Sequence, residues 1–236
     1  MADLMDFSRF TTISFDCYGT LIDWEAGILP VLRSVLSRHG QSLNDAAILE
    51  LYGEFEAEAE SGDYRKYRDV LKEVVRAFAR RLGFEASPAD LLKLSDSVGA
   101  WPPFPDTVAA LRALKRWYRL AIISNIDDDL FAETRKLLAV DFDAVITAER
   151  AKSYKPSIRN FELAFEALEI PRQRLLHAAQ SIYHDIVPAN SLGISTVWVN
   201  RKSARPGIGA VLAASGKPDL EVPDLATLAS LALTET

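Results

Sequence analysis

The chain has 236 residues, which is long enough to bury a sizeable core, either as one large domain or as a core with a smaller inserted unit. With 49% hydrophobic and 25% charged residues, its composition excludes disordered, collagen-like and disulfide-dense classes of protein. The net charge of −6 argues against nucleic acid or an anionic membrane as the main partner, so we expect a small-molecule substrate.

Cys17 is the single cysteine, which excludes an internal disulfide and a multi-cysteine zinc site. No apolar run approaches the roughly 20 residues that a membrane span requires. The first ten residues, MADLMDFSRF, carry acids where a signal peptide needs positive charge followed by an apolar stretch. The sequence therefore predicts a soluble, cytoplasmic protein.

The first predicted strand, residues 11–15, ends directly before Asp16, and Gly19 and Thr20 follow within four residues. An aspartate at a strand end with Gly-Thr behind it is typical of a loop that carries a phosphoryl-transfer nucleophile. A second acid is expected two residues after that nucleophile, but this chain has Tyr18 there. The stretch therefore predicts a nucleophile loop with one acid missing.

Residues 22–98 contain no convincing strand and are predicted to form several helices. In residues 67–83 the apolar side chains fall on one helical face, with Gly83 as a plausible end of the helix. The Pro- and Gly-rich residues 97–106 are predicted to form the hinge that returns the chain to its core. We expect a helical cap inserted after the first strand.

From about residue 104 onward, short β-rich runs alternate with amphipathic stretches, which predicts parallel strands joined by helical crossovers. The expected helices are residues 106–118, 128–139, 157–169 and 185–193, and the expected strands are residues 119–124, 142–147, 175–179 and 195–200. The fold class is therefore α/β, with a Rossmann-like parallel-sheet core. We predict a hydrolase core formed by residues 1–21 and 99–236 and a cap domain formed by residues 22–98.

Polar residues follow four of the predicted strands. In an open parallel sheet, ligands bind beyond the carboxyl ends of the strands, so these residues are expected to meet at one site. They are Asp16, the pair Ser124 and Asn125, Lys155, and residues 180–185.

These four stretches, DCYGTL, SN, YKP and HDIVPANSLGI, resemble in order and spacing the four motifs of the haloacid dehalogenase superfamily. The resemblance covers nearly the whole chain. Most members of that superfamily are phosphatases with an aspartate two residues after the nucleophile. With Tyr18 at that position in an Asp-x-Tyr-Gly-Thr loop, this chain resembles the (S)-2-haloacid dehalogenase (type II) branch instead.

The resemblance implies hydrolytic dehalogenation of short 2-haloalkanoic acids without a cofactor. A halide leaves without a proton, so the reaction needs a carboxylate nucleophile and no acid at position 18. Asp16 would attack the carbon that carries the halogen, with Lys155 holding it ionised. The resemblance further implies support of the nucleophile loop by Thr20, positioning of Lys155 and the hydrolytic water by Asp185, and substrate binding by Tyr18, Ser124, Asn125, Ser181 and His184. Relatives commonly dimerise, so a homodimer is compatible with this interpretation.

The chain departs from the family pattern at three places. The family has an arginine on an early cap helix that meets the halide and the carboxylate, whereas the corresponding residues 51–60 are acidic and contain none. The substitutes offered by the sequence are Arg65, Lys66 and Arg68. A family tyrosine appears as Phe161, and the fourth motif carries a shifted Gln180 and Ser181.

Two other functions stay open from the sequence. One is a magnesium-dependent phosphatase that acts on a small phosphate ester, with the ion held between Asp16 and Asp185. The other is a non-catalytic binding protein with the same fold.

Structural roles are the alternative for several of these residues. Asp185 is expected to open a helix, where a carboxylate stabilises the helix dipole without any catalysis. The same role is expected for Asp127, Asp128 and Asp129. Cys17, His39 and His177 are expected to be structural, and junction aromatics that line the pocket or simply pack are Tyr18, Trp24, Tyr64 and Trp101.

Overall fold

A computed structural model describes residues 5–201, 210 and 214–234 of the chain. Its centre is a six-stranded sheet in the order β3-β2-β1-β4-β5-β6, in which every neighbouring pair is parallel. The strands are β1 (Thr12–Phe15), β2 (Arg119–Ser124), β3 (Ala144–Thr147), β4 (Leu175–Ala179), β5 (Ser195–Val199) and β6 (Leu220–Val222). The predicted α/β parallel-sheet fold is confirmed. Residues 1 and 236, the ends of the predicted core, lie outside the described residues.

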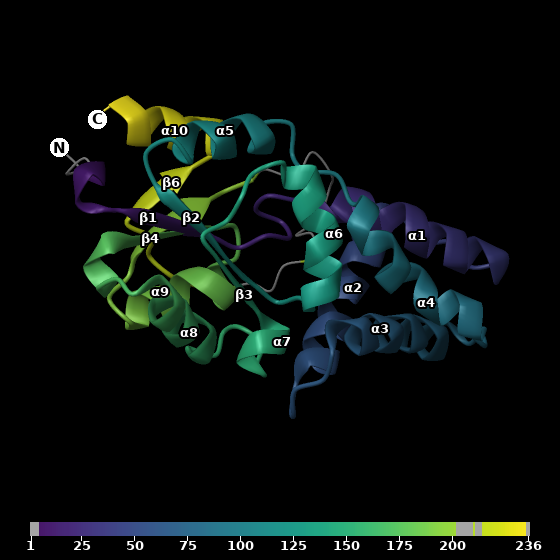
Figure 1. Cartoon of the computed structure of the whole chain (residues 1–236). Helices are drawn as coiled ribbons and strands as arrows, with labels where there is room; N and C mark the ends of the chain where they lie inside the picture. Colours follow the sequence, from purple (N-terminus) through teal and green to yellow (C-terminus); the bar gives the residue numbers. More distant parts are fainter. Residues whose placement is uncertain (1–4, 202–209, 211–213, 235–236) are drawn as a thin grey trace.

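Both faces of the sheet are buried, which explains why its strands are almost continuously apolar. In β2, Leu120 and Ile122 belong to one hydrophobic cluster, whereas Ala121 and Ile123 belong to another. Successive side chains of a strand point to opposite faces, so these clusters lie on the two sides of the sheet. In Figure 1, α5 (Thr107–Leu114) and α10 (Leu225–Thr234) lie together on one side, and α8 (Arg159–Leu168) and α9 (Val187–Ser191) on the other.

The register of the sheet brings the ends of the central strands together. The last residue of β1, Phe15, pairs with Ile122 of β2 on one side and with Ala178 of β4 on the other. The residues that follow these positions therefore leave the sheet at the same edge. This alignment carries Asp16, Ser124 and residue 180 towards one place.

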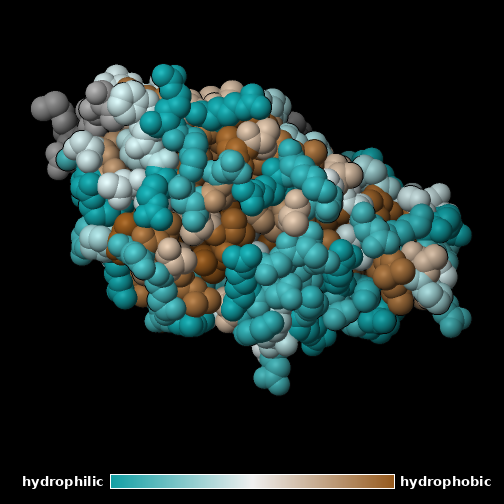
Figure 2. Space-filling view, viewed as in Figure 1, coloured by the Kyte–Doolittle hydropathy of each residue, from teal (hydrophilic) through white to brown (hydrophobic). Residues whose placement is uncertain are grey.

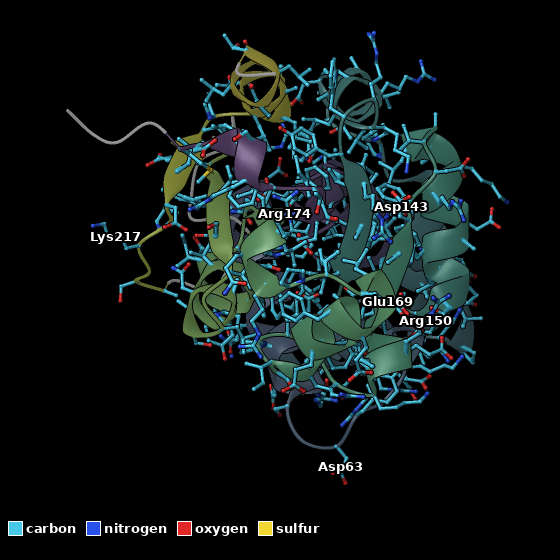
Figure 3. The ribbon with its side chains drawn as sticks, turned by 60° about the vertical axis from the view of Figure 1, so that its left-hand side comes forward. Asp63, Asp143, Arg150, Glu169, Arg174 and Lys217 are labelled. Atoms are coloured by element: carbon cyan, nitrogen blue, oxygen red, sulfur yellow. The ribbon has the colours of Figure 1, made fainter. Side chains whose placement is uncertain are left out.

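Four helices that precede α5 lie between β1 and β2 in the chain and occupy the right-hand side of the molecule in Figure 1. They are α1 (Trp24–Arg38), α2 (Asp45–Glu60), α3 (Tyr67–Leu82) and α4 (Pro88–Ser97). Gly83 ends α3 in the left-handed conformation at φ 73°, as its position in the sequence predicted. The loop between α2 and α3 projects from the molecule, with Asp63 at its outer tip (Figure 3). We call these helices and their loops, residues 22–98, the helical insertion; its status as a separate domain stays a prediction.

Two parts of the core differ from the sequence prediction. The helix expected over residues 185–193 is divided, because a π-helix at Ile182–Ile186 precedes the short α9. Asp185 therefore lies inside the π-helix, and Ser181 caps it. The strand β6 and the helix α10 were not predicted. The short helix α7 (Ala148–Ala151) was not predicted either. The remaining α-helix is α6 (Asp128–Leu138), and 3-10 helices lie at Phe7–Arg9, Val98–Ala100 and Arg172–Arg174.

The molecular surface mixes hydrophobic and hydrophilic residues, as Figure 2 shows for one face. The exposed apolar side chains include Ile158 and Val187, which are 43% and 42% exposed. Within the described part of the chain, no helix has both the length and the apolar character that a bilayer crossing requires. A homodimer stays a prediction.

Candidate active site

A small cavity of about 50 Å³ lies between the carboxyl ends of the central strands and the helical insertion. A volume of this size has room for a few water-sized groups. Its lining includes eight of the nine residues that the sequence singled out: Asp16, Tyr18, Ser124, Asn125, Lys155, Ser181, His184 and Asp185. The ninth residue, Thr20, lies behind Asp16 and contacts it directly.

The loop after β1 holds the Asp16 carboxylate through Thr20. The Thr20 hydroxyl donates a hydrogen bond of 2.9 Å to Asp16 Oδ2 and accepts one of 2.9 Å from the backbone amide of Gln180. Gly19 turns the chain at φ 91°, a conformation that favours glycine. A Cβ atom at Gly19 would lie 3.3 Å from the Trp24 indole nitrogen and 3.4 Å from the Gln180 side chain. The Gly-Thr pair therefore both shapes the turn and orients the carboxylate.

Lys155 connects the two aspartates of the site. Its ammonium donates to Asp16 Oδ1 at 2.9 Å, to Asp185 Oδ1 at 2.6 Å and to the Ile123 carbonyl at 2.8 Å. Asn125 fixes the lysine backbone, because its side chain accepts from the Lys155 amide at 2.7 Å and donates to the Lys155 carbonyl at 3.2 Å. The loops after β2 and β3 therefore position this cation together.

Asp185 has a second partner that the sequence analysis treated as purely structural. His177 Nε2 lies 3.0 Å from Asp185 Oδ1, and His177 Nδ1 lies 2.8 Å from the Ser14 hydroxyl. A histidine in the otherwise apolar run LLHAA was the signal for this role, because a fully buried polar side chain needs a hydrogen-bond partner. The other oxygen, Asp185 Oδ2, is buried and has no hydrogen-bond partner among the described residues.

Burial and pairing move the pKa values of this group in different directions. Burial raises the pKa of Asp16 above its usual value, and the Lys155 ammonium opposes that rise. For Asp185 burial acts in the same sense, but Lys155 and His177 outweigh it and lower the pKa. The two carboxylates in turn raise the pKa of Lys155 against the effect of its burial. The arrangement favours an ionised Asp185 beside a protonated Lys155.

Tyr18 stands where the second acid was expected, and its hydroxyl is engaged in a hydrogen bond that does not involve Asp16. The Tyr18 hydroxyl shares a hydrogen bond of 2.8 Å with Thr134 of α6, and its ring packs edge-on against Trp101. Burial raises the pKa of Tyr18 well above its usual range. Trp101 is buried and is not among the residues that line the cavity, so it packs.

Hydrogen-bonding side chains from the next loops complete the core side of the cavity. Ser124 is 1% exposed, and its hydroxyl has no partner within the described chain. Ser181 accepts from the His184 amide at 3.0 Å and lies 3.2 Å from its ring nitrogen Nδ1. Burial lowers the pKa of His184 to about 4, so its ring is neutral at pH 7. Ser181 caps the π-helix Ile182–Ile186, which contains His184, and π-helical turns are frequent at functional sites.

The helical insertion contributes a wall that sequence reasoning missed. Glu56 and Glu60 of α2, Trp24 of α1 and Tyr67 of α3 line the same cavity. Only Trp24 was among the expected aromatic lining residues. The acidic run of residues 51–60 was the available signal, but its side chains could be placed only once the helix was oriented.

Glu56 is buried, and its Oε1 accepts hydrogen bonds from the hydroxyls of Tyr52 and Tyr67. Burial raises the pKa of Glu56 to about 7 despite these bonds. Burial and then the charge of Glu56 raise the pKa of Glu60 well above its usual range. One long hydrogen bond of 3.4 Å reaches Glu60 from the Asn125 amide.

The expectation that a nearby cation replaces the family's cap arginine is wrong for the cavity. Lys66 pairs with Glu149 at 2.9 Å and Arg68 with Asp129 at 2.9 Å, while Arg65 is exposed in the projecting loop. None of Arg65, Lys66 and Arg68 lines the cavity. They lie at the start of α3, which turns this segment towards α6 and α7 instead.

Asp127 also differs from its expected role at the start of α6. Its buried carboxylate does not cap α6; it accepts from the backbone amides of Tyr67 and Arg68 at 2.9 and 3.0 Å. These are the first amides of α3, whose N-cap residue, Lys66, makes no side-chain cap of its own. The core therefore caps a helix of the insertion. His39 is structural as expected, 3.1 Å from Asp90, and Cys17 is buried.

The magnesium alternative requires oxygen donors at Asp16 and Asp185. Both carboxylates already bind the Lys155 ammonium, and Gln180 supplies an amide where a further acid would be needed. No group of three or more His, Cys, Asp and Glu side chains in the described residues is arranged to hold a metal ion. These residues do not fit a divalent-cation site.

Comparisons with known proteins agree with this geometry. An (S)-2-haloacid dehalogenase of Pseudomonas putida is 30% identical over 200 residues, which cover 81% of this chain and 86% of the relative. A crystal structure of an L-2-haloacid dehalogenase matches with a TM-score of 0.76 at 25% identity and covers 94% of this chain and 97% of that chain. The structure of the Xanthobacter autotrophicus L-2-haloacid dehalogenase with covalently bound chloropropionic acid shares the fold, with a TM-score of 0.80 at 21% identity over 94% of this chain and 98% of that one.

The predicted resemblance to the (S)-2-haloacid dehalogenases is thereby confirmed. The sequence model of the haloacid dehalogenase-like hydrolase family matches residues 10–193 of this chain. Because that match spans well over half of the chain, this protein belongs to the haloacid dehalogenase-like hydrolase family and is a hydrolase.

Proposed function

We propose that this hydrolase cleaves the carbon–halogen bond of a short 2-haloacyl compound, the class to which 2-haloalkanoic acids belong, through an ester on Asp16. The observation that carries the proposal is the series of hydrogen bonds that links Thr20, Asp16, Lys155 and Asp185. It holds one carboxylate at the cavity wall between a hydroxyl at 2.9 Å and an ammonium at 2.9 Å. The relative from Pseudomonas putida is named an (S)-2-haloacid dehalogenase, which supports this substrate class.

In the first step, an Asp16 carboxylate oxygen attacks the carbon that carries the halogen. A C–O bond forms as the carbon–halogen bond breaks, and the halide leaves with the bonding electron pair. No proton donor is needed for this departure. The hydrogen bond between Tyr18 and Thr134 is compatible with a residue that takes no part in it.

In the second step, water hydrolyses the Asp16 ester and releases the 2-hydroxy product. Asp185 Oδ2 is buried, lacks a partner among the described residues and belongs to a cavity-lining side chain, so it is available to accept the water proton. His177 and Lys155 hold the other oxygen of that carboxylate. The ammonium of Lys155 also stabilises negative charge as Asp16 is released.

The test is halide release from chloroacetate, 2-chloropropionate enantiomers and 2-chloroacetamide, with EDTA present. A phosphate-ester panel with magnesium runs in parallel. Halide release that EDTA does not affect, together with an Asp16 adduct seen by mass spectrometry, is expected. Phosphate release that depends on magnesium, without halide release, would contradict the proposal. Specific ligand binding without any turnover would instead support the non-catalytic alternative.

A further inference from the structure

The two sides of the cavity carry unequal charge compensation. On the core side, the Lys155 ammonium binds both Asp16 and Asp185. On the insertion side, Glu56 and Glu60 form no ion pair with a described residue; Lys155, the only lysine or arginine of the described lining, acts on Glu60 through its charge without binding it. A substrate in this cavity therefore meets carboxyl groups on the wall opposite its nucleophile.

The described cations near the cavity form no ion pair with this wall. An adjoining groove of about 340 Å³ shares Glu60, Lys155 and His184 with the cavity and also contains Lys152. The Lys152 ammonium lies 5.2 Å from the centre of the Tyr64 ring. Among the described residues, the approach to Glu60 thus adds no ion pair to it.

The two glutamates differ in how far their hydrogen bonds are satisfied. Tyr52 and Tyr67 both donate to Glu56 Oε1, so that oxygen is held in the wall. Glu60 has only the long contact of 3.4 Å from Asn125. Of the two glutamates, it has more capacity to accept a hydrogen bond from a bound molecule.

Ser124 supplies a complementary group on the core side. Its hydroxyl is buried, lacks a partner in the described structure and belongs to the cavity lining. Buried polar groups of this kind are normally paired, so the hydroxyl is available to donate to a carbonyl oxygen of the ligand. The cavity therefore offers a donor at Ser124 and an acceptor at Glu60.

We infer that the preferred substrate is a neutral 2-halocarboxamide, whose NH2 group donates to Glu60 and whose carbonyl oxygen accepts from Ser124, rather than the isosteric 2-haloacid anion. This inference rests on the proposed displacement at Asp16 and narrows its substrate. An amide keeps the shape and the activated carbon of the 2-haloacyl group, while a carboxylate would be repelled by the wall whenever Glu56 or Glu60 is ionised.

The ionisation of the wall supports the same choice. Burial already raises the pKa values of Glu56 and Glu60. Another anion in the cavity would raise them further, so a carboxylate would bind only while both glutamates keep their protons. The amide enters without this requirement.

The reaction is balanced with 2-chloroacetamide. Asp16 forms a C–O bond to the CH2 carbon, and the C–Cl bond breaks to give chloride. Water then adds to the ester carbonyl, regenerates the Asp16 carboxylate and releases 2-hydroxyacetamide and one proton. No oxidant, reductant or metal ion is consumed.

The experiment compares chloride release from 2-chloroacetamide and chloroacetate by the full-length protein at pH 8. We expect kcat/KM for 2-chloroacetamide to exceed that for chloroacetate roughly tenfold or more. The Glu60 acceptor should discriminate strongly between the NH2 donor of the amide and the carboxylate of the acid. A preference for chloroacetate would overturn the inference and still support the proposed function. Release from neither compound would overturn the proposed function itself. Asp16→Asn provides the blank for non-enzymatic alkylation.

Glu60→Gln locates the preference in the structure. An amide side chain removes the charge at nearly constant shape, so the amide-to-acid ratio should fall about fivefold or more, mainly through KM. Glu54→Gln is the matched control, since Glu54 is exposed on the same helix, and it should leave the ratio unchanged. A ratio that Glu60→Gln leaves intact would overturn the assignment. The assignment would also be overturned if chloroacetate were preferred to the amide and its turnover fell as pH rises. That pattern indicates a protonated glutamate that binds the carboxylate.

Discussion

The two walls of the cavity are built on different electrostatic plans. On the core side, Asp16 and Asp185 lie 2.9 and 2.6 Å from the Lys155 ammonium, so burial of charge is compensated by pairing. On the insertion side, Glu56 and Glu60 are held by hydroxyl and amide groups, and their pKa values rise. A compensated wall suits bond breaking, where charge must be fixed in place. An uncompensated wall suits selection of what enters.

Removal of the nucleophile should have the largest effect. Asp16→Asn is expected to lower kcat for halide release by roughly 10⁴-fold or more, because loss of a covalent nucleophile removes the reaction path. The amide keeps an acceptor for the Thr20 hydroxyl, so the unfolding midpoint should change much less than the activity. Chloride release and thermal unfolding of the same preparation give both quantities. Activity at wild-type level would remove Asp16 from the mechanism.

Loss of the shared cation should damage both activity and stability. Lys155→Met leaves two buried carboxylates unpaired, and breaking a buried ion pair in this way costs about 3–5 kcal/mol of unfolding free energy. The double variant Lys155→Met, Asp185→Asn removes one of the orphaned charges and should recover part of that stability without recovering turnover. Denaturant unfolding and halide release separate the two outcomes. Equal stability of the single and double variants would contradict the pairing argument.

The core wall could be predicted from the sequence because local rules determine it. A run of buried residues such as Thr12–Phe15 defines a strand, and the residue after it must leave the sheet at its carboxyl edge. Four such ends predicted Asp16, the pair Ser124 and Asn125, Lys155, and residues 180–185 at one site. The alternation of strands and helices likewise predicted the parallel sheet. Its edge strand β6 was missed because three residues are too short for a pattern.

The insertion wall could not be predicted because tertiary packing determines it. Glu54, Glu56, Glu58 and Glu60 are alike in the sequence, yet Glu56 is buried at the cavity and Glu54 is exposed. Only the orientation of α2 distinguishes them. Asp127 is a similar case, since its helix-start position predicts a cap for α6 but its carboxylate binds α3. Contacts between segments 60 residues apart leave no local signal.

Titration of the insertion wall should make stability depend on pH. The unfolded chain ionises Glu56 near pH 4.5, whereas the folded protein holds the proton until about pH 7 because burial raises its pKa. The folded state thus binds more protons in this window, so the unfolding free energy should fall as pH rises from 4.5 to 7, by up to about 3 kcal/mol.

Comparison with Glu56→Gln isolates this effect, because glutamine still accepts from Tyr52 and Tyr67 but does not titrate. The stability difference between wild type and variant, measured by denaturant unfolding at steps from pH 4.5 to 8, should favour the variant increasingly as pH rises. Groups that do not respond to Glu56, His184 among them, cancel in that difference, whereas Glu60 contributes to it because the charge of Glu56 raises its pKa. A difference that stays constant with pH would contradict a buried, proton-holding Glu56, and Glu54→Gln serves as the exposed control.

The contact between the two walls should give the smallest effect. Asp127 of the core accepts from the first amides of α3, including that of Tyr67, whose hydroxyl binds Glu56 in the cavity. Asp127→Ala should cost about 1–2 kcal/mol of unfolding free energy, the usual value of a helix cap, and Asp127→Asn should cost less because it keeps an acceptor. Since the cap also fixes Tyr67, the alanine variant should raise KM for the preferred substrate more than it lowers kcat. If kcat fell while KM stayed constant, Asp127 would act on the core wall that performs the displacement, and the division of labour between the two walls would have to be abandoned.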